Sequence, residues 1–160
     1  MKNDKFSHID SGNNPAMVNV SQKEITLRTA TARSIVQLTD EIMTGLEGKE
    51  IRSKKGPVFQ TAIIAGTMAA KKTGDLIPLC HPIGLEGCDF KIAIEGLDVI
   101  ITCTAKITAK TGVEMEALTG ASMAALTVYD MCKALSHDIV IKETRLIEKT
   151  GGKKDFKYNG

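Results

Sequence analysis

Hydrophobic and polar residues alternate in four stretches of the chain, and this period of two predicts β-strands. The first stretch, residues 24–38, is also rich in β-branched residues. Residues 88–94 and 99–107 alternate on either side of Gly96, which predicts a β-hairpin that turns at this glycine. A last strand is expected over residues 139–147.

Helix signals separate these strands. Thr39 is a favoured N-cap residue and predicts a short helix through residue 46. A second helix, slim because it is rich in Ala and Gly, is bounded by Pro57 at the first helical position and by Gly74 as a C-terminal stop. A third helix is expected over residues 113–135.

Without the short helix, the order of elements is β-α-β-β-α-β, which is typical of the ferredoxin-like α+β fold. We therefore expect an antiparallel sheet with the helices packed on one face, formed by a single domain over residues 23–150. Residues 1–22 are polar and predict an irregular N-terminal arm, whereas the Gly- and Lys-rich residues 151–160 predict a flexible C-terminal tail. This fold hosts many unrelated activities, so function must come from particular residues.

Composition excludes several classes of function. The net charge of the 160 residues is only +2, and aromatic residues make up 4%, which argues against binding of nucleic acid or of an acidic membrane. No apolar stretch approaches the roughly 20 residues of a membrane span, and the N-terminus is too polar for a secretory signal. The four cysteines lack the spacing of a zinc site. We expect a cytoplasmic protein without a resident metal.

The third helix is apolar around most of its circumference, yet it contains charged residues that need partners or a purpose. Glu114 lies three residues after Thr111, and this spacing of a capping box favours a capping role for its carboxylate. Lys133 lies three residues after Asp130, so the two side chains can pair on the helix surface. An ordinary surface ion pair is the alternative interpretation of that spacing.

A polar stripe also follows this helix within about 80° of arc, at about 100° per residue, and it either lines a pocket or faces solvent. Its members are Glu116, Thr119, Thr127 and Asp130. A rise of about 1.5 Å per residue separates Glu116 from Asp130 by roughly 21 Å. One small substrate cannot contact both within one chain, so we hypothesise a site at a two-fold interface between subunits.

Basic residues and one imidazole flank the predicted helices. Lys54 and Lys55 precede the second helix, whose N-terminus attracts anions and disfavours an ammonium ion. A lysine there is suited to proton transfer, although solvated loop lysines are the alternative. His81 lies between two prolines, and a lone Cys-His pair is weak evidence for a metal. Lys153 follows two glycines and belongs either to a lid over phosphates or to a solvated tail.

These segments together resemble the cyclic pyranopterin monophosphate synthase family, also called molybdenum cofactor biosynthesis protein C, over nearly the whole chain. The most specific matches are the runs Leu-Ile-Pro-Leu-Cys-His-Pro at 76–82 and Thr-Gly-Val-Glu-Met-Glu-Ala-Leu-Thr at 111–119. The other matching segments are residues 6–10, 17–21, 55–56, 64–66, 69–71 and 129–133.

The resemblance implies conversion of 3′,8-cyclo-7,8-dihydroguanosine 5′-triphosphate to cyclic pyranopterin monophosphate, with release of pyrophosphate. It implies proton transfer by Lys55 and Lys133 and an acidic catalytic role for Asp130. Binding of the phosphorylated pterin precursor would involve the residues Leu79, Cys80, His81, Glu114, Met115 and Glu116. Lys71 and Lys153 suit the triphosphate by their charge, and Mg²⁺ can accompany the triphosphate. The resemblance also implies a homohexamer, a trimer of dimers, with sites between subunits.

Three positions depart from the family pattern. Asn19 replaces an Asp in the arm, Pro57 replaces an Asp after Lys-Gly, and Lys154-Asp155 replaces a Ser-Gly pair in the tail. We expect these changes to remove an acid from the arm, to exchange a capping carboxylate for a rigid residue and to shorten a glycine hinge. The competing hypothesis for the chain is a non-catalytic regulatory module of the same fold that binds a nucleotide.

Overall fold

The computed structural model describes residues 8–160, so residues 1–7 of the expected arm lie outside the described residues. Within these described residues, the strands of two sheets alternate with four helices. Their bounds are β1 Thr26–Gln37, α1 Asp40–Met43, β2 Leu46–Glu47, β3 Glu50–Ser53, β4 Gly56–Pro57, α2 Val58–Ala70, α3 Thr73–Leu76, β5 Gly87–Glu95, β6 Asp98–Ala109, α4 Glu114–Cys132, β7 Val140–Thr150 and β8 Phe156–Lys157.

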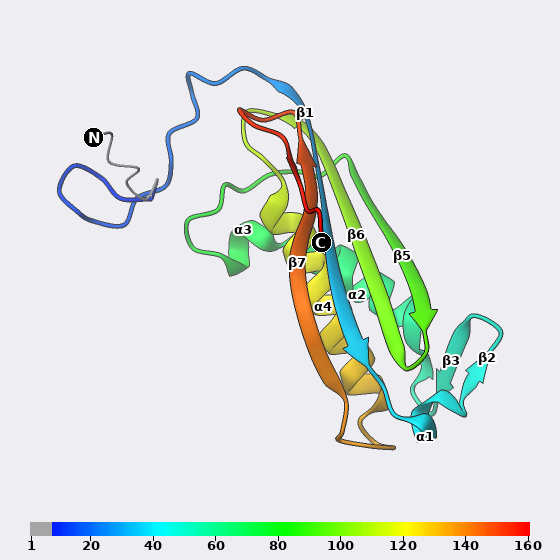
Figure 1. Cartoon of the computed structure of the whole chain (residues 1–160). Coiled ribbons are helices and arrows are strands. Elements are labelled where there is room, and N and C mark those ends of the chain that lie inside the picture. Colours follow the sequence, from blue (N-terminus) through cyan, green and yellow to red (C-terminus); the bar gives the residue numbers. More distant parts are fainter. Residues whose placement is uncertain (1–7) are drawn as a thin grey trace.

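The main sheet has the strand order β5-β6-β1-β7-β8, and every pair in it is antiparallel. The helices α2 and α4 lie side by side behind this sheet, on one of its faces (Figure 1). Strands β5 and β6 form the expected hairpin, which turns at Gly96 with a positive φ of 62°. These observations confirm the α+β, ferredoxin-like prediction.

Small residues let α2 and α4 cross closely above the sheet. A Cβ atom on Gly66 of α2 would lie 2.8 Å from the carbonyl oxygen of Gly120 of α4 and 2.5 Å from the ring of Phe90. Alternate residues of β1 and β6, such as Ala32 and Ile101, are fully buried beneath this crossing. The Ala- and Gly-rich composition of α2 is therefore a packing requirement, because larger side chains would separate the two helices.

The segment between β1 and α2 differs from the prediction. Thr39 is the N-cap of α1, as expected, and accepts a bond from the Ile42 N–H, but the helix ends at Met43. The strands β2, β3 and β4 then form a small separate sheet that the sequence analysis did not predict. Pro57 lies in β4 and is the N-cap of α2 rather than its first helical residue.

Two helix-end predictions were also wrong. Helix α2 ends at Ala70, and Gly74 lies inside the short helix α3 instead of stopping α2. The predicted capping box is absent from α4, because Val113 is its N-cap and no side chain caps it. Glu114 is the first residue of α4, and its carboxylate binds Lys149 of β7 instead. The ion pair with Lys149 thus takes the place of the backbone hydrogen bond that the capping box would have given Glu114.

The C-terminal residues close the fold. Strand β7 continues to Thr150, past the predicted end, and β8 pairs with it inside the segment assigned to a tail. The cation of Arg145 lies 4.2 Å from the ring centre of Tyr158, just after β8. Among the helices within residues 8–160, none is both long enough and apolar enough to cross a membrane.

Candidate active site

A cavity of about 450 Å³ lies at the N-terminal end of α4, between the N-terminal arm and the loop that follows α3. It brings together most of the residues predicted to bind substrate. These are Cys80, His81, Glu114, Met115 and Glu116. Leu79 belongs to the same loop but is not among the described residues that line this cavity. The cavity can therefore enclose a small molecule between two segments that are far apart in the sequence.

Glu116 is the buried acid of this cavity, with only 4% of its surface exposed. Burial raises the pKa of its carboxyl to about 7, and the negative charge of Glu114 adds to this rise. A solvent-facing stripe, which was one interpretation of the pattern, is thus wrong for this residue. At neutral pH the Glu116 carboxyl is partly protonated, so it can either donate or accept a proton.

His81 holds the N-terminal arm against the cavity. Its Nε2 atom lies 2.8 Å from the carbonyl oxygen of Val18. Because a carbonyl oxygen only accepts hydrogen bonds, Nε2 donates here. Lys110 supports the same arm, since its Nζ donates to the carbonyl oxygen of Ser21 at 2.7 Å. The arm is thereby a wall of the site.

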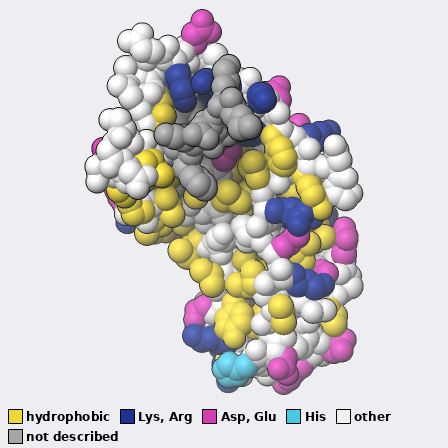
Figure 2. All heavy atoms as spheres, turned by 60° about the vertical axis from the view of Figure 1, so that its left-hand side comes forward, with side chains coloured by type: hydrophobic (Ala, Val, Ile, Leu, Met, Phe, Trp, Pro, Cys, Tyr) yellow, Lys and Arg dark blue, Asp and Glu magenta, His cyan; other side chains and the backbone are white. Residues whose placement is uncertain are grey.

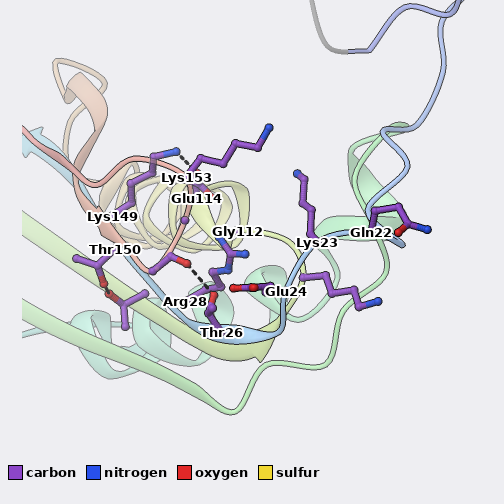
Figure 3. A pocket seen from close by; sticks show the side chains of 14 residues that line it. Gln22, Lys23, Glu24, Thr26, Arg28, Gly112, Glu114, Lys149, Thr150 and Lys153 are labelled. Carbon is purple, nitrogen blue, oxygen red and sulfur yellow. Dashed lines mark hydrogen bonds and ion pairs between the residues drawn. The ribbon is translucent and has the colours of Figure 1, made fainter.

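A second cavity, of about 490 Å³, adjoins the first and is bordered by basic side chains. The two cavities share Lys23, Gly112, Glu114 and Lys149 in their walls. Figure 3 shows Lys23 from the segment before β1 and Lys153 from the turn after β7 extending toward one another, with Arg28 of β1 below them. The lining lysines and arginine are Lys23, Arg28, Lys110, Lys149 and Lys153. This arrangement suits a multiply charged anion.

Glu114 and Lys149 form an ion pair at the border of the two cavities, with 2.7 Å between Oε1 and Nζ. Burial opposes ionisation of Glu114, but the bond from Lys149, together with the charge of Arg28, holds the pKa of this carboxyl below its ordinary value. The sequence analysis missed Lys149 and Arg28. They lie on β7 and β1, and only the sheet pairing brings these strands together, so no local motif marked the two residues.

A third group of charges surrounds Asp130 at the other end of α4. The Asp130 carboxylate lies 2.7 Å from Nζ of Lys133 and 2.8 Å from Nζ of Lys55. These bonds, first from Lys133 and then from Lys55, lower the pKa of Asp130 to about 2, and the same pairing raises the pKa of Lys133. The pair expected from the spacing of Asp130 and Lys133 is present, and Lys55 joins it from the turn between β3 and β4.

The predicted site residues therefore form groups at opposite ends of α4, consistent with the separation expected from their spacing. Lys153 lies in the basic cavity, whereas Lys71 lines a different cavity of about 270 Å³ that shares Glu116 with the first. Within residues 8–160, no three His, Cys, Asp or Glu side chains are grouped so that they could hold a metal ion.

Known proteins align with nearly the whole of this chain. The cyclic pyranopterin monophosphate synthases of Xanthomonas campestris pv. campestris (strain B100) and Lysinibacillus sphaericus (strain C3-41) are 52% and 53% identical to it. The first alignment covers 95% of this chain and 93% of that protein, and the second covers 92% and 94%.

Longer relatives contain a similar region. The "Molybdenum cofactor biosynthesis bifunctional protein" of Synechocystis sp. (strain ATCC 27184 / PCC 6803 / Kazusa) is 56% identical over 155 residues, which are 94% of this chain and 45% of that protein. The chain thus spans less than half of that relative. The sequence profile of the MoaC family matches residues 17–152. Since this match spans most of the chain, and includes most residues in the walls of both large cavities as well as Lys55, Asp130 and Lys133, the chain belongs to the MoaC family.

Proposed function

We propose that this chain is a cyclic pyranopterin monophosphate synthase, a lyase of molybdenum cofactor biosynthesis. Its substrate would be 3′,8-cyclo-7,8-dihydroguanosine 5′-triphosphate, and its products cyclic pyranopterin monophosphate and pyrophosphate. The names of the relatives that align with this chain over nearly their whole length support this proposal. The structural observation that carries it is the junction of a basic cavity with one that contains a buried acid.

The basic cavity would bind the triphosphate. Lys23, Arg28 and Lys153 come from three separate segments, so they can contact several phosphate oxygens at once (Figure 3). Charge-assisted hydrogen bonds to phosphate are among the strongest in proteins. The same cations would offset the charge that develops on the departing pyrophosphate. Lys149 would contribute as well, because it already lies at the border of the two cavities.

The adjoining cavity would hold the reduced ring system. Cys80, His81 and Met115 would contact the ring, and Glu116 would exchange a proton with it, since its pKa of about 7 lets both protonation states be populated. We propose that Lys55 and Lys133 also transfer protons, as the resemblance to the family implies. Their link to Asp130 supports this role, because the carboxylate holds both ammonium groups at one place.

The two groups of residues would meet across a subunit interface. They lie at opposite ends of α4, so a second chain must supply Lys55, Asp130 and Lys133 to the cavities of the first. A band of hydrophobic side chains crosses the face shown in Figure 2. The exposed large hydrophobic residues of α2 and α4 include Ile64, Met68 and Leu126, which suits contact with another subunit. We infer a cytoplasmic homohexamer built as a trimer of dimers.

Pyrophosphate release from the cyclised substrate tests the activity. We expect Lys55→Ala and Lys133→Ala to reduce turnover by at least about a hundredfold, because each removes a proton-transfer group. Lys54→Ala is the matched control, since Lys54 is the exposed neighbour of Lys55 on the same turn. A regulatory module would instead bind the nucleotide and return it unchanged. Unimpaired turnover in both lysine variants would contradict their assignment.

Mixed oligomers test where the site is assembled. If Lys55 of one chain acts with Glu116 of another, a mixture of Lys55→Ala and Glu116→Ala subunits contains some sites with both native residues. Random pairing of inactive subunits should then restore about a quarter of the native activity. If each chain formed its own complete site, the mixture would stay as inactive as the separate variants.

A further inference from the structure

The N-terminus of α2 has no cap from its own sequence. Its N-cap residue is Pro57, which makes no side-chain bond to the first turn. Proline has no side-chain acceptor, whereas the N–H groups of a first helical turn need partners from outside the helix. Pro57 therefore provides no local cap, and another group must take that role.

Glu50, from strand β3, supplies the missing acceptor. Its Oε1 accepts a bond of 2.8 Å from the Phe59 N–H, and its Oε2 accepts one of 3.1 Å from the Gln60 N–H. Oε1 also accepts from the Ile51 N–H at 2.8 Å, on its own strand. Both carboxylate oxygens are used, and they tie β3 directly to the first turn of α2. A local Asp at position 57 could cap the helix but could not make this connection.

The strand that Glu50 ties to the helix leads into the turn that bears Lys55. Strands β3 and β4 are paired through Ser53 and Gly56, and residues 54–55 form the turn between them. The Ser53 hydroxyl accepts a bond from the Lys55 N–H and donates one to the Gly56 carbonyl oxygen. Gly56 has a φ of 115°, a conformation that favours glycine. The turn is thus rigid in itself, and its direction depends on how β3 is anchored.

The direction of this turn decides whether Lys55 reaches α4. Nζ of Lys55 lies 2.8 Å from Oδ2 of Asp130 and 3.2 Å from the backbone oxygen of the same residue. Because α2 packs against α4, a strand anchored to α2 is held at a defined position relative to Asp130. Side-chain reach alone does not ensure this contact, since a lysine on a free hairpin samples many positions.

We propose that Glu50 is a positioning residue for Lys55, and that it acts by clamping strand β3 to the first turn of α2. This inference rests on the proposed function, in which Lys55 transfers a proton. A shift of the turn by about 1 Å can cost as much as a hundredfold in rate. The clamp would therefore act on kcat much more than on KM, because Lys55 would be misplaced while the cavities at the other end of α4 stay intact.

The variant Glu50→Ala tests the clamp, with pyrophosphate release as the assay. We expect kcat to fall about tenfold or more and KM to change little. Glu47→Ala is the matched control, because Glu47 lies in the same small sheet and makes an exposed ion pair with Arg52. It should leave kcat unchanged. Loss of the Lys55 contact should also raise the pKa of Asp130, which carbon-13 NMR can follow in the folded variant.

A second-site variant separates positioning from helix capping. In Glu50→Ala/Pro57→Asp, a local carboxylate restores the cap of α2, so we expect thermal stability to recover while kcat stays low. Recovery of both would overturn the proposal, as would an unchanged kcat in Glu50→Ala. If Glu50→Ala does not fold, the double variant can be compared with the single variant Pro57→Asp, because these two proteins differ only at Glu50. Full activity of Lys55→Ala would refute the function of Lys55, whereas the NMR measurement would still test the clamp.

Discussion

Glu116 provides a quantitative test of the environment inside the cavity, because its carboxyl is buried at the start of α4. Its pKa rises from an ordinary value of 4.5 to about 7. Between these values the folded protein keeps a proton that the unfolded chain releases, so the free energy of unfolding falls as the pH rises. Above about pH 7 the stability lost amounts to about 3 kcal/mol, at 1.36 kcal/mol for each pH unit.

The variant Glu116→Gln has the same shape but does not titrate, so it should escape this loss. We expect the stability of the native protein relative to the variant to fall by about 2 to 3 kcal/mol between about pH 5 and about pH 8.5. Urea denaturation followed by circular dichroism at both pH values measures this difference. Other titrating groups are common to both proteins and cancel in the comparison.

Glu148→Gln serves as the control, because Glu148 is an exposed carboxylate on β7. Its stability relative to the native protein should be nearly independent of pH. If Glu116→Gln showed the same small pH dependence as Glu148→Gln, the Glu116 carboxyl would titrate as an ordinary acid. The argument that burial keeps it partly protonated at neutral pH would then be refuted.

Two further substitutions test the basic cavity and its supporting turn. Gly151→Ala should lower the free energy of unfolding by about 2 kcal/mol or more, measured by thermal denaturation, because Gly151 has a φ of 82° and an added Cβ would collide with the Leu27 carbonyl oxygen. Lys149→Met should raise the pKa of Glu114, measured by carbon-13 NMR, since it removes the bond that lowers it. The same variant should weaken binding of pyrophosphate about tenfold in calorimetry, and unchanged affinity would exclude Lys149 from the anion site.

The main sheet was predictable because its signals are local. The alternation in β1, β5 and β6 is long and regular, and Gly96 marks the hairpin turn. The small sheet of β2, β3 and β4 escaped prediction because two of its strands have only two residues each, too few to show a period. The capping box failed for another reason, since its spacing was correct but Lys149 provided a stronger partner for Glu114.

At the three positions that we expected to depart from the family pattern, the structure shows which neighbouring groups make contacts. Asn19 accepts bonds from the Ser21 N–H and hydroxyl with its amide oxygen, the role that an Asp carboxylate could fill. Glu50 replaces the cap that Pro57 cannot provide. Asp155 accepts a bond from the Gly151 N–H and so fastens the turn between β7 and β8. The structure thus assigns a contact to each of these three positions.

The sequence by itself determined the order of β1, α2, β5, β6, α4 and β7, the ferredoxin-like class and the pairing of Asp130 with Lys133. These features depend on residues that are close in the chain, so periodicity and spacing report them directly. Only the tertiary structure decided that Glu116 is buried, that Lys149 joins Glu114, and that the basic side chains of β1 and β7 surround one cavity. Burial and long-range charge pairing arise when distant segments pack together, and no local pattern encodes which segments will meet.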